Sequence, residues 1–180
     1  MTMNPIRRVI STALLLSTLP VFAQTVVREP VAGVRNFARV ETTIACAGAI
    51  DAATAVPEIK KLGFVSIINL REETEPGANV ENERAVAEAA GLKYFHVPFN
   101  ATTPDPKAAD AFIAVITSLG VQPALVHCAS GGRASAMWLI KRLVVDRWDV
   151  ERATREATDL GQTSVTLRTF ALDYASKYKP

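Results

Sequence analysis

Short apolar blocks alternate along the chain with longer blocks in which apolar residues recur at helical spacing. The block at 123–128 is apolar on both faces and the block at 64–70 is rich in β-branched residues, patterns typical of strands buried inside a parallel sheet. The short blocks predict strands at residues 64–70, 93–99 and 123–128. The longer blocks predict helices at residues 51–63, 79–91, 107–119, 134–145, 150–161 and 164–178. Between Phe37 and Ala47, shorter apolar stretches suit one or two edge strands.

Strands that alternate with helices at this spacing predict an α/β fold. We expect a central, mainly parallel sheet of about four to five strands flanked by helices, and a C-terminal helical layer formed by the last two helices. Asp149 is expected to cap the first of these helices and Gly161 to end it. In the helix at 134–145, apolar residues fall on one predicted face: Ala136, Met137, Leu139, Ile140, Leu143 and Val144.

The first residues have a different pattern. Arg7 and Arg8 precede an apolar run from Val9 to Ala23, which is too short and too interrupted by polar residues and proline to span a bilayer stably. This pattern predicts a signal peptide at residues 1–23, and an N-terminal membrane anchor is the alternative. A periplasmic or secreted protein would then consist of a lead-in at 24–36 and a single catalytic domain at 37–180.

The numbers of charged residues, histidines and cysteines indicate which partners and cofactors to expect. Cleavage after Ala23 removes Arg7 and Arg8 and no acid, so the 20 basic and 18 acidic side chains of the whole chain become 18 of each. A balanced charge predicts no nucleic-acid partner, and the mature chain has no predicted membrane span. Its two histidines and two cysteines lack the spacing of metal ligands, so we expect neither a metal nor another cofactor.

The segment ALVHCASGGRAS, residues 124–135, carries the candidate chemistry. It joins a buried strand to a helix at the carboxyl end of a parallel strand, where open α/β sheets bind ligands. Gly131 and Gly132 permit a tight loop in which the N–H groups of Ala129, Ser130 and the glycines converge on one anion. Those donors, the helix N-terminus and Arg133 are expected to favour a nucleophilic Cys128 thiolate.

The guanidinium of Arg133 matches two oxygens of a phosphate-like group, so the loop has the parts needed for attack on phosphorus. The plain structural alternative is a buried, unreactive cysteine before a glycine turn.

The chain here resembles the cysteine-dependent phosphatases of the dual-specificity type, whose signature is H-C-x-x-G-x-x-R-[ST]. The segment HCASGGRAS keeps His127, Cys128, Gly131 and Ser135 in register, and FVSIINLREETE and KYFHVPFN resemble flanking strands of the same group. The resemblance covers about residues 40–161. It implies a dual-specificity-like fold, attack by Cys128 on a phosphorylated small molecule or protein, a phosphocysteine intermediate, and phosphoryl binding by Arg133.

Arg133 comes one residue earlier than in that signature. The C-x4-R spacing is similar instead to the beta-lactamase-hydrolase-like phosphatase and sulfurtransferase family, and it also occurs in rhodaneses. The runner-up activity is therefore sulfur transfer through a Cys128 persulfide, and a non-catalytic phosphate-binding module is a third reading. The strand end Asn69-Leu70-Arg71, followed by a helix, looks phosphatase-like rather than rhodanese-like.

The other candidates are less sharply defined. A phosphatase of this kind needs a carboxylic acid in the loop after residue 99, and Asp105 is the carboxylate there, although Asp105-Pro106 is also a helix-capping pattern. Arg71 is expected, together with Glu72, Glu73 and Glu75, either to line the cleft or to lie in a solvated charged turn. Ser135 is expected either to hydrogen-bond the thiolate or to be an ordinary short side chain in the first turn of a helix. Cys46 is either a small buried residue or the partner of Cys128 in a reversible disulfide.

Overall fold

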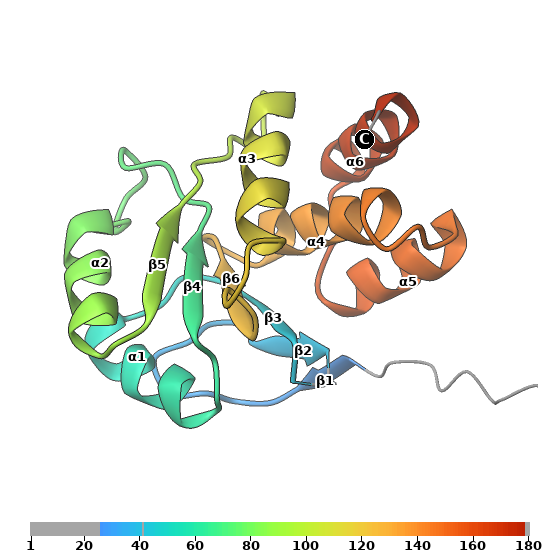
Figure 1. Ribbon diagram of the computed structural model, residues 1–180. Coiled ribbons are helices and arrows are strands. Elements are labelled where there is room, and N and C mark those ends of the chain that lie inside the picture. Colours follow the sequence, from blue (N-terminus) through green and yellow to red (C-terminus); the bar gives the residue numbers. More distant parts are fainter. Residues whose placement is uncertain (1–25, 41, 179–180) are drawn as a thin grey trace, which may run out of the picture.

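The computed structural model describes residues 26–40 and 42–178, so the predicted signal peptide lies outside the described residues. Within them the chain forms a six-stranded sheet with helices on both faces (Figure 1). The strands are β1 (Val26–Arg28), β2 (Ala38–Val40), β3 (Ile44–Ala47), β4 (Ser66–Asn69), β5 (Lys93–His96) and β6 (Ala124–His127). The helices are α1 (Ala52–Lys61), α2 (Val80–Ala89), α3 (Pro106–Ile116), α4 (Gly132–Val144), α5 (Val150–Asp159) and α6 (Val165–Lys177). The predicted α/β class is confirmed.

The strand order is β1-β2-β3-β6-β4-β5. Strands β3, β6, β4 and β5 are parallel, and β1 and β2 are added in antiparallel pairs. The expectation of edge strands between Phe37 and Ala47 is wrong, because β2 and β3 each pair on both sides. Strand β3 is also buried throughout. The segment predicted as a lead-in contributes β1, so the sheet has more strands than expected.

Two hydrophobic clusters cover the two faces of the sheet. One cluster packs α1 and α2 against it around Val56, Ile59 and Ile67. The larger cluster packs α3, α4, α5 and α6 on the opposite face. Both ends of α5 follow from local signals that the sequence contains: Asp149 accepts a hydrogen bond from the N–H of Arg152 at 2.8 Å, and Gly161 has a φ of 112° after the helix.

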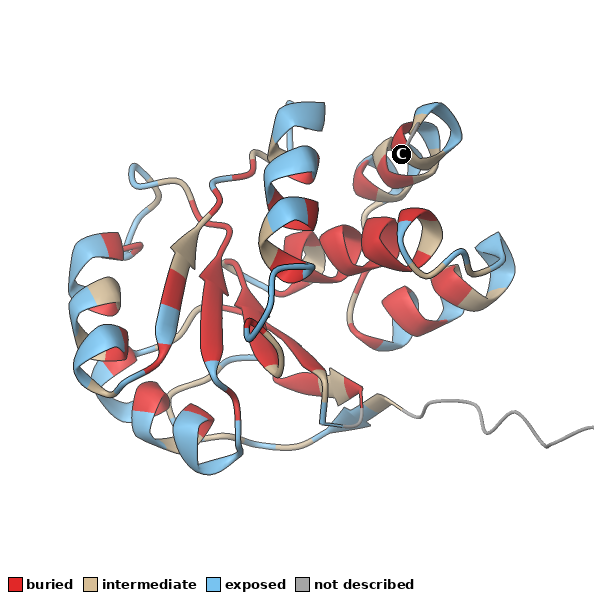
Figure 2. Ribbon diagram, in the orientation of Figure 1, coloured by how far each residue is buried: buried red, intermediate tan, exposed pale blue. Residues whose placement is uncertain are grey.

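Helix α4 is buried on every side rather than on the one predicted face (Figure 2). It packs against β3 and β6 on one side and against α3, α5 and α6 on the others. Even Lys141 and Arg142 are buried, because their charged ends pair with Asp146 and stack on tryptophan rings. The C-terminal helical layer therefore encloses α4, and the sheet orients the N-terminus of this helix.

A buried polar cluster joins α4 to α5. Glu156 on α5 accepts hydrogen bonds from Trp138 Nε1 at 2.7 Å and from Arg142 Nε at 2.7 Å. At the other end of the layer, the Tyr174 hydroxyl on α6 donates to Asp110 on α3 at 2.6 Å. These bonds fix the helices that form one wall of the cleft described below.

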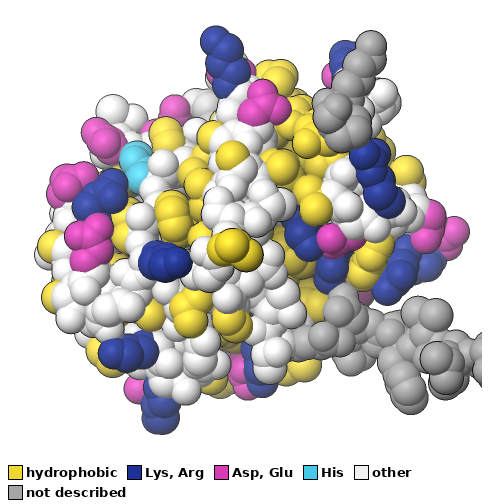
Figure 3. Space-filling view, viewed as in Figure 1, with side chains coloured by type: hydrophobic (Ala, Val, Ile, Leu, Met, Phe, Trp, Pro, Cys, Tyr) yellow, Lys and Arg dark blue, Asp and Glu magenta, His cyan; other side chains and the backbone are white. Residues whose placement is uncertain are grey.

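The surface in Figure 3 mixes charges of both signs, while hydrophobic side chains gather between α3 and the C-terminal helices. None of the helices in residues 26–40 and 42–178 is long and apolar enough to cross a membrane.

We predict that Glu156→Ala lowers the free energy of unfolding by about 3–5 kcal/mol, because it leaves the buried Arg142 without this carboxylate. The matched control on the same helix is Glu151→Ala, whose pair with Arg155 is exposed, and its effect should stay below about 1 kcal/mol. Urea unfolding measures both. Equal effects of the two variants would contradict this account.

Candidate active site

The candidate active site lies where the parallel strands end. Residues that directly follow β6, β4 and β5 meet at the carboxyl edge of the sheet, as expected for an α/β fold. Beside them is a cleft of about 700 Å³. Its lining comes from β1 and the β1–β2 loop, from the loops after β4, β5 and β6, from the start of α4, and from the end of α5 through the start of α6: Arg28, Asn36, Glu72, Glu75, Asn100, Ala101, Thr102, Ser130, Gly132, Arg133, Thr158, Leu160, Gly161, Thr163, Ser164 and Leu167.

Cys128 lies at the floor of the loop, with 1% of its surface exposed. The N–H of Gly131 donates to its sulfur at 3.1 Å. Gly131 caps α4 with a φ of 105°, a backbone conformation that residues with a Cβ rarely adopt. The predicted role of this glycine in shaping a tight loop is thus matched by its geometry.

The loop is held from outside by the neighbouring strand and its turn. The N–H of Ala49 donates to the carbonyl of Ala129 at 3.1 Å. The side-chain amide of Asn36 donates to the carbonyl of Ser130 at 3.1 Å. Both carbonyls are thus bonded to groups outside the loop, an arrangement that suits a loop whose N–H groups face an anion.

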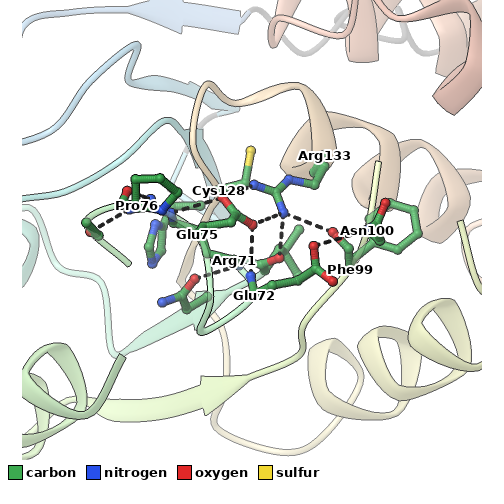
Figure 4. A network of polar contacts seen from close by, with 12 residues as sticks. Arg71, Glu72, Glu75, Pro76, Phe99, Asn100, Cys128 and Arg133 are labelled. Atoms are coloured by element: carbon green, nitrogen blue, oxygen red, sulfur yellow. Dashed lines mark hydrogen bonds and ion pairs between the residues drawn. The ribbon is translucent and has the colours of Figure 1, made fainter. Parts of the chain in front are cut away.

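Arg133 is fixed by a two-pronged ion pair with Glu75 (Figure 4). Its Nη1 and Nη2 donate to the two carboxylate oxygens of Glu75 at 2.6 and 2.8 Å. Nη1 also donates to the carbonyls of Leu70 at 3.1 Å and Phe99 at 2.9 Å. One guanidinium thus joins the loops after β4, β5 and β6.

Arg71 holds the turn that carries Glu75 rather than lining the cleft. Its guanidinium donates to the carbonyls of Pro76 at 2.6 Å and Gly77 at 2.8 Å, and to Glu75 at 3.3 Å. Its own N–H donates to the Asn69 side chain at 2.8 Å. Arg71 is 5% exposed, so it lies in neither of the two predicted settings, the cleft wall or a solvated turn.

The ion pair between Glu75 and Arg133 shifts the pKa of both side chains. Burial alone raises the pKa of the Glu75 carboxyl, but hydrogen bonds from Arg133 and from the N–H of Glu72 outweigh it and bring the pKa to about 2. Burial lowers the pKa of Arg133, and the hydrogen bond with Glu75 and the nearby Cys128 sulfur more than reverse this, so the pKa is raised. Both groups are charged at neutral pH.

The remaining residues of the predicted loop divide into two sets. Ser130, Gly132 and Arg133 line the cleft. Ser135 is fully buried, and its hydroxyl bonds to the carbonyls of Gly131 at 3.0 Å and Leu160 at 3.1 Å. In this structure it therefore ties the loop to the end of α5.

Asp105 is not brought to the cleft. It is exposed, and its carboxylate accepts a hydrogen bond from the N–H of Lys107 at 2.9 Å as the cap of α3. Glu72 lines the cleft instead, and its Oε2 accepts a hydrogen bond from the amide of Asn100 at 2.9 Å (Figure 4). The amide oxygen of Asn100 accepts from the N–H groups of Thr102 and Thr103, which orients its NH₂ toward Glu72.

Cys46 and Cys128 are both free and buried. Cys46 on β3 lies opposite Val126 on β6, two residues before Cys128 and on the same face of the sheet. Regular strand spacing puts the two Cα atoms about 8 Å apart, so a disulfide would require a backbone shift. Burial raises the pKa of the Cys46 thiol, which keeps it protonated. The disulfide stays a prediction.

His127 points into the opposite layer. Its Nε2 lies 2.7 Å from Oε1 of Glu83 on α2, and both side chains are buried. This contact ties the end of β6 to α2. Among the described residues, no group of three or more His, Cys, Asp or Glu side chains could hold a metal ion.

Sequence reasoning missed Asn36 and Arg28. For Glu72 and Glu75 it left open a place in the cleft wall or in a solvated charged turn, and the structure places both in the cleft lining. No local signal identifies Glu75, because its partner Arg133 lies 58 residues away in the chain.

We predict that the pair of Glu75 and Arg133 makes folding sensitive to acid. The pKa of Glu75 is about 2 in the folded protein against an ordinary 4.5, so its stabilisation is present above pH 4.5 and is lost as the pH falls toward 2. The melting temperature of the wild type minus that of Glu75→Gln should be constant above pH 5 and shrink below it. Glu73→Gln, an exposed neighbour, is the control and should show no such trend.

The fold is similar to the folds of solved structures that include phosphatases. A DUF442 phosphatase from Shewanella putrefaciens CN-32 matches with a TM-score of 0.67 and 20% identity, over 82% of this chain and 96% of that chain. TpbA from P. aeruginosa matches with a TM-score of 0.60 and 18% identity, over 82% and 91%. The catalytic domain of the PP-IP phosphatase Siw14 from S. cerevisiae matches with a TM-score of 0.63 and 18% identity, over 81% and 88%. A search of curated protein sequences finds no match.

A sequence profile identifies the family. The profile of the beta-lactamase hydrolase-like protein, phosphatase-like domain, matches residues 36–144, which include β2 to β6, the Cys128 loop and α4. This is the family to which the C-x4-R spacing pointed. With its fold and its cysteine loop in agreement, the chain belongs to the phosphatase-like domain family of the beta-lactamase hydrolase-like proteins.

Proposed function

We propose that this protein is an exported cysteine-dependent phosphatase that hydrolyses phosphomonoesters through a phosphocysteine on Cys128. The Cys128 thiolate attacks phosphorus, the bond from phosphorus to the ester oxygen breaks, and that oxygen leaves with a proton from a carboxylic acid. Water then attacks the phosphocysteine, the P–S bond breaks, and inorganic phosphate leaves the restored thiolate.

The observation that carries this proposal is the position of Arg133. Its guanidinium is already locked by Glu75 and two carbonyls beside a sulfur that also receives the Gly131 N–H. Groups that are held in place before the substrate arrives need no reorganisation when charge spreads over the phosphoryl oxygens. A persulfide sulfur needs no such planar fork, so this feature favours phosphoryl transfer over sulfur transfer.

Glu72 takes the role of the acid in this proposal. The resemblance to the dual-specificity phosphatases implies an acid in the loop after residue 99, where this chain has Asn100. Here Asn100 holds the Glu72 carboxylate in the cleft at 2.9 Å, whereas Asp105 caps α3 outside the cleft lining. The side chain of Asn100 would thus place the acid instead of supplying it.

Two kinds of substrate are compatible with the structural neighbours. A Cys→Ser variant of TpbA has been crystallised with pTyr, and Siw14 is a PP-IP phosphatase. Export is supported by the pattern of residues 1–23. A phosphorylated small molecule or protein outside the cytoplasm is therefore the expected substrate.

A paired assay tests the reaction. The purified protein should hydrolyse 4-nitrophenyl phosphate, and Cys128→Ser should lower kcat at least about a thousandfold, because the nucleophile is lost. Cys46→Ser is the matched control and should retain activity. Intact phosphatase turnover in Cys128→Ser would sink the mechanism, and thiocyanate formation from thiosulfate and cyanide without phosphatase turnover would favour sulfur transfer.

The identity of the acid is tested by varying the leaving group. Glu72→Gln should lower kcat about a hundredfold for phenyl phosphate, whose leaving oxygen needs a proton, and far less for 2,4-dinitrophenyl phosphate. The control is Glu73→Gln on the same turn, which should show no such selectivity. The same pattern in Asp105→Asn, with Glu72→Gln unaffected, would assign the role to Asp105.

A further inference from the structure

Arg28 ends β1 at the same edge of the sheet as the candidate active site. Strand β1 is antiparallel to β2, which is antiparallel to β3, so β1 runs in the same direction as β3 and β6. Arg28 lies in one row with Ala38, Cys46 and Val126. Residues directly opposite one another share a face, so the Arg28 side chain lies on the face that carries Cys128 and α4.

The guanidinium of Arg28 is held at the wall of the cleft. Its Nε and Nη2 donate to the carbonyl of Asp159, the last residue of α5, at 3.1 and 2.7 Å. Carbonyls at a helix C-terminus attract cations, so α5 fixes the position of this charge. Arg28 and Arg133 line the same cleft from different elements.

The charge of Arg28 is not matched by a carboxylate. Its partner at Asp159 is a backbone carbonyl, and the neighbouring Glu29 pairs with Arg39 at 2.7 Å. In the described part of the chain, Nη1 of Arg28 donates to no atom. The charge of Arg133, in contrast, is balanced by the carboxylate of Glu75. Arg28 is thus the cleft-lining cation that still offers both an uncompensated charge and an unused donor.

The space between Arg28 and the cysteine loop is short and open. A Cβ placed on Gly161 would lie 4.0 Å from Arg28 Nη2 and 4.0 Å from Ser135 Oγ, so these atoms are within twice that distance of each other. Since Gly161 has no side chain, nothing from this residue fills the gap. Next to it, Thr163 and Ser164 line the cleft, and Ser164 caps the N-terminus of α6.

We propose that Arg28, together with the hydroxyls of Thr163 and Ser164, forms a second anion subsite, and that the substrates are small phosphomonoesters carrying a second phosphate group. This inference rests on the proposed function, in which Cys128 and Arg133 take the phosphate that is cleaved. An arginine fork and hydroxyl donors are well suited to phosphate oxygens. In the described cleft lining, apolar side chains come only from Ala101, Leu160 and Leu167, which suits a polar molecule better than an aromatic ring.

Calorimetric titration with phosphonates tests the subsite without any turnover, because their C–P bonds are not cleaved in a phosphatase reaction. The ligands are straight-chain alkane bisphosphonates of one to six carbons, each compared with the alkylphosphonate of equal length. At least one bisphosphonate should bind the wild type about tenfold more tightly than its monophosphonate, since the second group binds within the same cleft. This exceeds the twofold gain that two equivalent ends give by chance.

Two variants locate the effect. Arg28→Gln should abolish the advantage of the bisphosphonate while leaving alkylphosphonate affinity within about twofold. Arg155→Gln removes the same charge from an exposed position on α5 and should keep the advantage. An unchanged melting temperature verifies that each variant is folded, and the wild-type comparison needs no variant at all.

The proposal is overturned if no bisphosphonate binds the wild type better than its monophosphonate. It is also overturned if Arg28→Gln weakens both ligands equally, or if Arg155→Gln removes the advantage as fully as Arg28→Gln does. Phosphatase turnover without a bisphosphonate preference would reject the subsite alone. A bisphosphonate preference without turnover would reject the proposed reaction and retain the subsite.

Discussion

The ion pair between Arg133 and Glu75 is the contact on which the arrangement of the site depends. Its two short hydrogen bonds, and those from Arg133 to the carbonyls of Leu70 and Phe99, join the ends of three strands through one side chain. Arg71 in turn holds the turn that presents Glu75. A guanidinium restrained in this way loses little freedom on binding an anion, which is the property that the proposed phosphatase reaction requires of it.

The buried helix α4 connects this ion pair to the opposite wall of the cleft. Its first turn carries Arg133, and its second half binds α5 through Arg142 and Glu156. The end of α5 then holds Arg28 through the carbonyl of Asp159. The floor and one wall are therefore parts of one packed layer, and the distance between the two arginines is set by core packing rather than by a flexible loop.

The local pattern of the chain was sufficient for most of the fold. All six described helices and the strands β4, β5 and β6 were predictable, because periodicity, caps and glycines act within a few residues. The errors concern partners: β3 was expected at an edge, and α4 was expected to bury one face. An apolar segment does not reveal how many neighbours surround it, since that depends on elements distant in the chain.

For the site, the sequence by itself determined the cysteine loop: Cys128, the two glycines and Arg133 form a contiguous motif with a recognisable family spacing. Only the tertiary structure decided what surrounds it. Glu75 lies 58 residues from Arg133, and Arg28 lies 131 residues from Asp159. Such pairs meet because parallel strands bring their carboxyl ends to one edge, and no local pattern records which loop side chains then face each other.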